Sequence, residues 1–364
     1  MATYKRQRYL FMTLDPVHIG TGGYRLGRVD NSIVREPGTK IPKIPGTSLH
    51  GAARSYAAQL YETPEAAGQD QKYVKNPENN PICYTFGYLH SGNSDNPQTG
   101  NPNPKKKEIA YSGVVNIFDA HILLFPVHSM VGPVWVSTRE RLDDAGFTNL
   151  PDEPDNLETV ILNWDNSDKP DKRLNLGWLM LNAEIKAEIE APPQWQNDKR
   201  YKAINKIVIV KDALFSQVVN SNLEVRTSVA INPETGAAND GALFTYEAIP
   251  RATFLTADVV LDDYRSGEKG WSLGEIKETG KLKEDGTKNP LPGGAWQCPL
   301  CVVKSGLKMI EWLGVGGMGT RGFGRMAMIG DPKTVELQEL FNPLQSNQQT
   351  SSGSSIETTE GGQA

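Results

Sequence analysis

Strand-like and helix-like segments alternate only loosely along this chain, and long polar stretches separate them. Hydrophobic runs rich in β-branched and aromatic residues predict strands at 5–14, 112–127, 132–138, 205–210 and 224–232, a short one near 28–35, and a pair over roughly 242–261. Helical patterns lie at 139–145, 212–219 and 302–313. This order predicts an α+β fold, with helices on one side of a mostly antiparallel sheet. No regular internal repeat is present, so we do not expect a solenoid.

The segment "PKIPGTSLHGAARSYAAQLY" predicts a proline-bounded loop that leads into a helix. Thr47 and Ser48 are its candidate N-caps, because a hydroxyl can accept a hydrogen bond from the free N–H groups of a first turn. Asp212 is the candidate cap of the helix at 212–219. The apolar stripe of the first helix consists of Leu49, Ala52, Ala53, Tyr56 and Leu60.

Several polar stretches do not match the pattern of a packed core. The stretch from about 63 to 111 contains "GNSDNPQTGNPNPKKK", which is rich in Pro, Asn and Gly and predicts a mobile loop. Residues 150–200 are acidic and irregular. From about residue 343, the Ser/Gln/Thr/Gly-rich tail is expected to be disordered.

Two glycine-rich segments are candidates for binding an anion. The first, "HIGTGGYRLGRVDNSIVRE", spans His18–Glu36 and places Asp30 between Arg28 and Arg35; the second is "GVGGMGTRGFGR" at 314–325. Glycine N–H groups can approach a phosphate closely. The first segment has neither G-x-G-x-x-G spacing nor a following G-K-[ST], which argues against a stand-alone nucleotide-binding enzyme.

The charge of the chain is unevenly distributed. The net charge is -5, but residues 1–60 hold nine Lys/Arg against three Asp/Glu. Residues 143–190 hold twelve acids against four bases, and the tail from Asp331 adds five acids against one lysine. A basic N-terminal part can bind a polyanion, because phosphate binding depends on the local field. An ordinary mixed, solvated surface is the alternative.

The remaining composition predicts a cytoplasmic protein without a membrane span. No apolar run approaches the roughly 18 residues of a transmembrane helix. The segment "MATYKRQRYLFMTLD" lacks the apolar core and cleavage site of a signal peptide. Three cysteines cannot all pair, and a chain of 364 residues can bury a core without disulfides, so we expect a reducing compartment.

Several segments together resemble the RAMP superfamily of CRISPR proteins, and in particular the repeated backbone subunit of type III effector complexes of the Cmr sort. They are the first glycine-rich segment, "IPGTSLHGAARS", "FDAHILLFPVHSMVGPVWVST", "AINPETGAANDGALFTYEAIP" and "GVGGMGTRGFG", in this order from about residue 9 to 330. The chain departs from the family at 63–111, at 264–301 and at His50, where relatives usually carry Lys.

The resemblance implies one domain over 1–342 with a ferredoxin-like (RNA-recognition-type) core. This domain would contain the loop insertion at about 63–111 and an inserted thumb at about 150–200, and the tail would occupy 343–364. Several copies would stack head to tail along a guide RNA, together with other type III subunits. Each copy would place an acid beside a flipped-out nucleotide of the complementary target RNA and cut there.

Asp30, in "GRVD", matches the position of that acid. RNA carries its own nucleophile, the 2′-hydroxyl, and a carboxylate can accept its proton or hold a divalent cation such as Mg²⁺ or Mn²⁺. His18 is a candidate acid–base partner, although packing under the loop or contacting RNA is the alternative. Glu247 is a weaker candidate. The alternative for the whole chain is a scaffold subunit that binds guide RNA without cutting.

Guide binding is expected at glycines, which allow close backbone approach, and at arginines, which pair with phosphates. Contacts should fall on phosphate and sugar, because base pairing reads the sequence. The candidate residues are Gly20, Gly22, Gly23, Ser48, Arg54, Gly316, Gly317, Gly319, Arg321 and Arg325. His121 and His128, in a run that predicts a buried strand, are expected to be structural.

The pair Cys298 and Cys301, in "WQCPLCVV", has the spacing of two metal ligands. A structural Zn²⁺ needs two more ligands, and Cys83 and His90 in "CYTFGYLH" are the candidates. Some relatives in type III complexes carry such a zinc. Three free thiols are the alternative.

Overall fold

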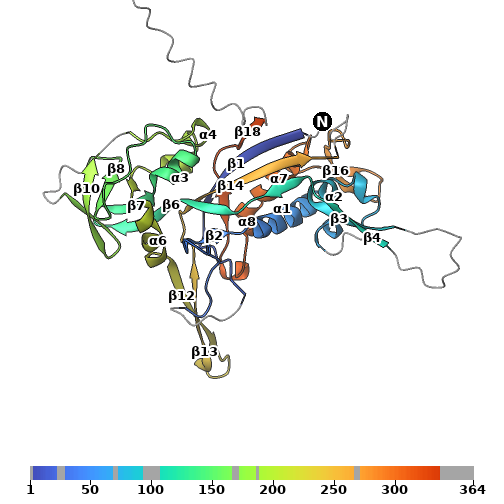
Figure 1. Cartoon of the computed structure of the whole chain (residues 1–364). Coiled ribbons are helices and arrows are strands. Elements are labelled where there is room, and N and C mark those ends of the chain that lie inside the picture. Colours follow the sequence, from blue (N-terminus) through green and yellow to red (C-terminus); the bar gives the residue numbers. More distant parts are fainter. Residues whose placement is uncertain are drawn as a thin grey trace, which may run out of the picture.

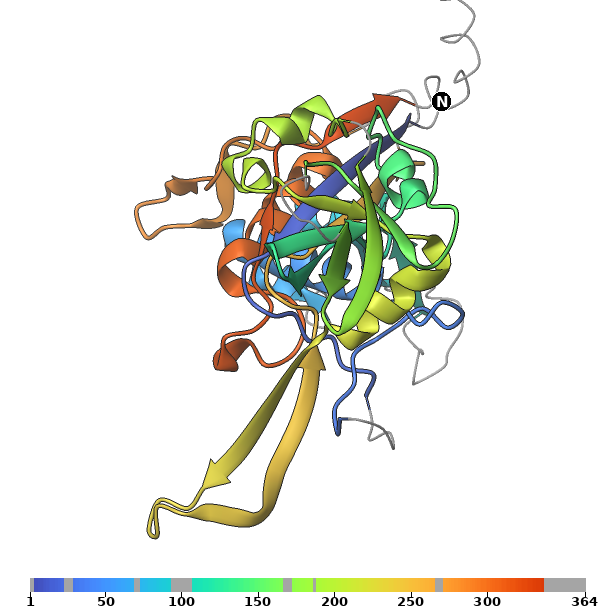
Figure 2. The same cartoon turned by 90° about the vertical axis from the view of Figure 1, so that its left-hand side faces the viewer.

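The computed structural model describes residues 3–22, 29–68, 73–92, 107–165, 172–185, 188–265 and 271–336. Its body is elongated and built around a large sheet (Figure 1). A β-hairpin projects well beyond that body, which is clearest after a quarter turn (Figure 2). None of the helices in these ranges is both long and apolar enough to cross a membrane.

Twelve strands form the central sheet in the described part of the chain. Its spatial order is β17 (Met326–Met328), β1 (Thr3–Thr13), β14 (Phe254–Asp263), β6 (Ala120–Ser129), β7 (Gly132–Ser137), β11 (Ile207–Ile209), β8 (Thr159–Leu162), β10 (Leu179–Ile185) and β9 (Arg173–Leu176). At its sides, β18 (Lys333–Glu336) pairs with β1, β5 (Val115–Ile117) with β14 and β2 (Lys43–Ile44) with β6. The described pairings are antiparallel except β7 with β11 and β8 with β10.

Three two-stranded sheets and eight α-helices complete the described chain. The small sheets are β3 (Gly87–Gly92) with β4 (Lys107–Ser112), β12 (Glu224–Ile231) with β13 (Ala238–Ala248), and β15 (Glu278–Leu282) with β16 (Lys288–Pro290). The helices are α1 (Gly46–Leu60), α2 (Pro81–Phe86), α3 (Arg139–Asp144), α4 (Pro193–Gln196), α5 (Lys199–Lys202), α6 (Asp212–Ser221), α7 (Pro299–Lys308) and α8 (Ile310–Leu313).

Helices cover both faces of the sheet, which corrects the expectation that they lie on one side. Strand β1 shows the reason, because Tyr9, Leu10 and Phe11 are all at most 1% exposed although consecutive side chains point to opposite faces. Tyr9 and Phe11 belong to the core formed with α1, α2, α6 and α7. Leu10 belongs to a second core with residues of α3, α4 and α5.

Helix α1 begins before both of its predicted caps. Pro45 precedes its first residue, Gly46, so Thr47 and Ser48 lie inside the first turn and neither hydroxyl caps the helix. The N–H of Gly46 donates instead to a carboxylate oxygen of Asp119 at 2.7 Å. Likewise, α6 begins at Asp212 with Lys211 in the capping position, so Asp212 is not its cap.

The structure also differs from the sequence analysis in the segment 28–35 and at two histidines of β6. The strand expected near 28–35 is absent from described residues 29–35, which form only isolated bridges. His121 and His128 are exposed rather than buried, because they occupy outward positions of β6. Most of "GNSDNPQTGNPNPKKK", and the tail from 343, lie outside the described residues. Within 150–200, β8, β9 and β10 extend the central sheet, whereas the projecting hairpin is β12–β13 (Figure 2).

We predict that Gly306→Ala lowers the free energy of unfolding by about 2–3 kcal/mol, because overpacking forces packed elements apart. A methyl group at Gly306, on α7, would lie 2.1 Å from the carbonyl oxygen of Ala53 on α1. Urea unfolding of the purified chain measures the change.

The matched control is Gly51→Ala on α1, where a methyl group meets nothing within 4 Å. It should be neutral or stabilise by up to about 1 kcal/mol. Equal effects of the two variants would contradict the close approach of α1 and α7.

Candidate functional site

The structure brings the two glycine-rich segments into contact. The N–H of Gly317 donates to the carbonyl oxygen of His18 at 2.9 Å, and the N–H of Gly324 donates to that of Pro16 at 2.9 Å. Gly316 has a φ of +88°, and a Cβ there would lie 2.3 Å from Cδ1 of Ile19. Only glycine fits this position, since both the backbone conformation and the space exclude a side chain.

Gly314, Gly316 and Gly319 have formal G-x-G-x-x-G spacing, but their setting is not that of a dinucleotide fold. The segment follows helix α8, and a short 3₁₀ turn, Gly319–Arg321, comes next. A dinucleotide fingerprint instead follows a strand and opens a helix, so that the helix N-terminus meets the pyrophosphate. The glycines therefore serve close packing and backbone exposure here.

A cavity of about 370 Å³ opens between the first turns of α1 and the second glycine-rich segment. The positive end of α1 is partly compensated, because the Asp119 carboxylate, itself paired with Lys43, accepts the N–H of Gly46. Backbone donors with this field suit a phosphate. The cavity is lined by Thr47, Ser48, Gly51, Ala52, Tyr56, Leu313, Gly314, Val315, Gly316, Gly319 and Phe323.

The three predicted RNA-binding arginines have different surroundings. Arg321 is exposed, and its guanidinium carbon lies 5.3 Å from the centroid of the Phe244 ring. Arg325 is exposed but forms an ion pair with Asp15. Arg54 donates to the carbonyl oxygens of Ala66 at 3.0 Å and Gly87 at 2.9 Å. These bonds link α1 to the segments that follow it, and the predicted RNA contact of Arg54 stays a prediction.

Asp30 is exposed and is held by a single residue of the projecting hairpin. Its Oδ2 accepts hydrogen bonds from the backbone N–H of Thr245 at 2.7 Å and from the Thr245 hydroxyl at 2.9 Å. These bonds favour the ionised form and lower the pKa of Asp30 below its usual value. The carboxylate is thus ionised and accessible, as a base or cation ligand must be at neutral pH.

His18 is 5% exposed and packs beneath the second glycine-rich segment. Its Nδ1 lies 2.7 Å from the carbonyl oxygen of Glu247, and its ring meets Tyr246 edge to face. Gly20 leaves room for the imidazole, because a Cβ there would lie 3.1 Å from Nε2. This environment corresponds to the alternative in which His18 packs under the loop.

Glu247 is buried and forms an ion pair with Arg35, which also donates to the Asn220 side chain at 3.0 Å. This pairing favours a structural role for Glu247 over catalysis.

Asp30 and His18 are both held by β13. The residues that bond to them, at 245 and 247, are two positions apart on this strand. A strand rises about 3.3 Å per residue, so these two residues are roughly 7 Å apart.

The predicted RNA contacts in the first glycine-rich segment are only partly described. Gly20 and Gly22 belong to the described residues, and Gly22 has a φ of +70° that favours glycine. Gly23 lies outside them.

Thr245 was not predicted from the sequence at all. Nothing local distinguishes it, because the residue that it holds is 215 positions away.

The candidate zinc ligands form a pair rather than a cluster. The sulfur atoms of Cys298 and Cys301 are 2.9 Å apart, and their hydrogen bond lowers the pKa of Cys301 and raises that of Cys298. Cys83 is buried on α2, which raises its pKa to about 11. The side chain of His90 lies outside the described residues. Among the described side chains, no three His, Cys, Asp or Glu residues gather to hold a metal.

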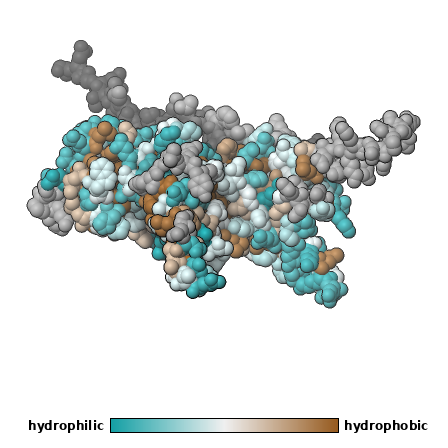
Figure 3. Space-filling view, turned by 90° about the horizontal axis from the view of Figure 1, so that it is seen from below, coloured by the Kyte–Doolittle hydropathy of each residue, from teal (hydrophilic) through white to brown (hydrophobic). Residues whose placement is uncertain are grey.

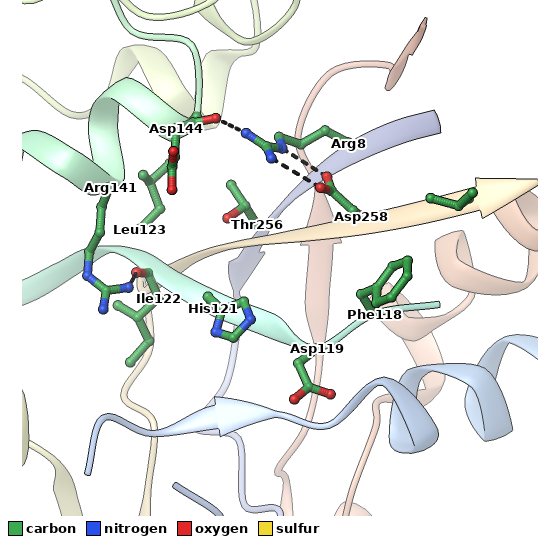
Figure 4. A pocket seen from close by; sticks show the side chains of 12 residues that line it. Arg8, Phe118, Asp119, His121, Ile122, Leu123, Arg141, Asp144, Thr256 and Asp258 are labelled. Atoms are coloured by element: carbon green, nitrogen blue, oxygen red, sulfur yellow. Dashed lines mark hydrogen bonds and ion pairs between the residues drawn. The ribbon is translucent and has the colours of Figure 1, made fainter. Parts of the chain in front are cut away.

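A separate pocket of about 460 Å³ lies against the sheet between β1, β6, β14 and α3 (Figure 4). There Arg8 donates to both oxygens of Asp258, at 2.8 and 3.1 Å, and to the carbonyl oxygen of Asp144 (Figure 4). Arg8 is thus already neutralised, and none of the predicted site residues lines the pocket. The segments around Asp30 and the second glycine-rich segment remain the candidate site.

Comparison with known proteins agrees with this geometry. A family model of the RAMP superfamily matches residues 10–327. The CRISPR system Cmr endoribonuclease Cmr4 of Pyrococcus furiosus is 28% identical over 285 residues, which cover 74% of this chain and 85% of that protein.

Two solved structures share the fold at 14% identity. They are the type III-B Cmr-beta bound to cognate target RNA, with a TM-score of 0.53 over 89% of this chain and 96% of that one, and Cmr-beta in the apo state, with a TM-score of 0.51 over 92% and 98%. The family model spans most of the sequence and includes both glycine-rich segments, which confirms the resemblance found in the motifs: the chain belongs to the RAMP superfamily.

Proposed function

We propose that this chain is a backbone subunit of a type III CRISPR ribonucleoprotein, which binds guide RNA and cleaves complementary target RNA at regular intervals. The observation that carries the proposal is Asp30, an exposed and ionised carboxylate fixed at the base of a projecting hairpin. The similarity to an endoribonuclease over 85% of that protein supports the same activity.

The guide RNA would follow the cavity between α1 and the second glycine-rich segment. The backbone N–H groups of that glycine-rich segment and the N-terminus of α1 suit phosphates. They do not read bases, as is required of a subunit that accepts any guide. Ser48, Gly316 and Gly319 line the cavity, and the exposed Arg321, two residues after Gly319, would add a positive charge. Further copies of this chain and other type III subunits would continue the path along the RNA.

The core would be the ferredoxin-like unit of this superfamily. In chain order, β1, α1, β6, β14, α7 and β17 form a β-α-β-β-α-β series, and the four strands lie in the spatial order β17-β1-β14-β6. In such a unit, both helices pack on one face, as α1 and α7 do here. The face from which the hairpin projects carries both hydrophilic areas and hydrophobic patches (Figure 3).

Cleavage would use the 2′-hydroxyl of the target RNA. Its O–H bond breaks as Asp30 accepts the proton, and the oxygen forms a bond to the adjacent phosphorus. The P–O5′ bond breaks, the 5′ oxygen leaves with the bonding electrons and takes a proton from water, and a 2′,3′-cyclic phosphate remains. Asp30 offers a single carboxylate, which fits Mg²⁺ or Mn²⁺ only where RNA phosphate and water complete the coordination. When bound there, the cation would supply charge stabilisation on the phosphate. A structural Zn²⁺ on Cys298 and Cys301 would need ligands beyond this pair.

A scaffold without cleavage is the second candidate, and a specific observation favours it. The carboxylate of Asp285 accepts the same two bonds, from the N–H of Thr287 at 2.9 Å and its hydroxyl at 2.6 Å, in an ordinary turn. Such an arrangement therefore also occurs where an aspartate only stabilises the chain. Mutation separates the two candidates.

We predict that Asp30→Asn lowers the rate of target cleavage by at least about 100-fold, because an amide cannot accept the hydroxyl proton. The assay uses the complete complex, assembled with guide RNA and Mg²⁺, and a complementary labelled RNA. Guide and target binding should persist. Asp285→Asn is the matched control, since it removes a carboxylate with the same type of bonds, and its rate should stay near that of the wild type. Unchanged cutting by the Asp30→Asn complex would leave the scaffold as the remaining candidate.

We also predict that Arg321→Ala weakens guide binding uniformly across guide sequences and reduces the slope of log K against log [salt] by about one. The reason is that one phosphate contact would be lost. Filter binding at several salt concentrations measures the slope. Lys277→Ala is the control, because this exposed lysine pairs with Glu275 near the β15–β16 hairpin. A sequence-dependent loss of affinity would argue against a backbone contact.

A further inference from the structure

Asp30 lies on a segment without regular secondary structure, so its position depends on the residues that hold it. The segment docks along β13 through two backbone bonds. The N–H of Asn31 donates to the carbonyl oxygen of Thr245 at 3.0 Å, and the N–H of Glu247 donates to that of Asn31 at 3.2 Å. The backbone next to Asp30 is therefore fixed to one strand.

The side chain of Thr245 completes this attachment. Its hydroxyl donates to Oδ2 of Asp30 at 2.9 Å and accepts from the N–H of Asp30 at 3.1 Å. With the bond from the Thr245 N–H, three hydrogen bonds join these two residues. Both bonds to the carboxylate end on Oδ2, which leaves Oδ1 without a hydrogen bond from any other described residue.

The hairpin end of this attachment is firmly packed. Tyr246, next to Thr245 on β13, and Ala248, two residues further on, are 4% and 1% exposed and pack against Phe323 of the second glycine-rich segment. Arg226 on β12 lies over the same ring at 4.8 Å. Phe323, which also lines the cavity, therefore holds the part of β13 that carries Thr245.

We propose that Thr245 is the positioning residue for Asp30: it fixes Oδ2 so that Oδ1 is presented to the RNA, and it links the placement of the β12–β13 hairpin to cleavage. The inference rests on the proposed function, because it assumes that Asp30 acts on RNA. Thr245 itself does not touch the reacting atoms. It sets the orientation of the group that does.

The charged groups described on the surrounding elements pair with other residues and do not hold the Asp30 carboxylate. Arg35 pairs with Glu247, and Arg226 pairs with Glu224 at 2.6 Å. The lowered pKa of Asp30 has its largest cause in the backbone N–H of Thr245 and its second in the Thr245 hydroxyl. Loss of the hydroxyl should therefore raise the pKa of Asp30 towards its usual value, because the ionised form loses one of its donors.

The test is a pH–rate profile of target cleavage by the complete complex with Thr245→Val, which keeps the shape and the backbone N–H. A base acts above its pKa, so a raised pKa moves the acidic limb of the profile to higher pH. We expect that shift, with a loss of roughly tenfold at neutral pH from poorer orientation, a part of the 10²–10⁴ that general-base catalysis supplies. Thr245→Ser restores the hydroxyl and should restore both values.

The matched control is Thr227→Val, which makes the same change directly opposite Thr245 in the hairpin. Its profile should overlay that of the wild type. Guide and target binding by all variants are measured in parallel. A Thr245→Val profile that overlays the wild type, or an equal effect of Thr227→Val, would overturn the inference while Asp30→Asn still abolishes cleavage. If Asp30→Asn cleaves normally, the proposed function itself has failed.

Discussion

The antiparallel pairing of β1 with β14 is the constraint on which the site depends. It joins Thr3 through Met12 to Asp263 through Phe254, segments some 250 residues apart. Strand β17 pairs with the same end of β1. The chain leaving β1, the chain entering β14 and the chain entering β17 therefore meet at one edge of the sheet. These three connections carry the first glycine-rich segment, the end of β13 and the second glycine-rich segment, so the topology alone assembles the site.

Within that assembly, β13 joins the two glycine-rich segments into one defined surface. The loop with Asp30 docks on residues 245–247, the loop with His18 bonds to Glu247, and Phe323 packs on Tyr246. Sites held by regular elements are more exact than sites held by loops alone. The position of the exposed Asp30 carboxylate is set by β13 and not by a free loop, which supports the proposed role in catalysis.

The sequence predicted the core elements because their apolar runs are long and strongly patterned, as at 5–14 and 112–127. It misjudged what depends on distant contacts. The segment 29–35 looks like a strand but forms only isolated bridges, since β13 and neighbouring loops use its backbone bonds. The bonds from Arg54 to the carbonyl oxygens of Ala66 and Gly87 could not be predicted either, because both partners lie outside its helix. The role of Thr245 could not be read locally, whereas Asp30 was found only through the motif of a family.

The charge distribution also has a different meaning once the structure is known. Among the described basic residues of the first 60 positions, several already pair with acids, namely Lys5, Arg8, Lys43 and Arg35. The local excess of positive charge therefore overstates the field that an approaching RNA would meet, because paired charges largely cancel beyond a Debye length of about 8 Å. Backbone N–H groups need no charged side chain, although some here already donate within the chain, as Gly46 does to Asp119 and Gly317 does to His18. An acidic chain can bind a polyanion on such terms, because short-range donors replace net charge as the source of affinity and are nearly indifferent to the sequence that they hold.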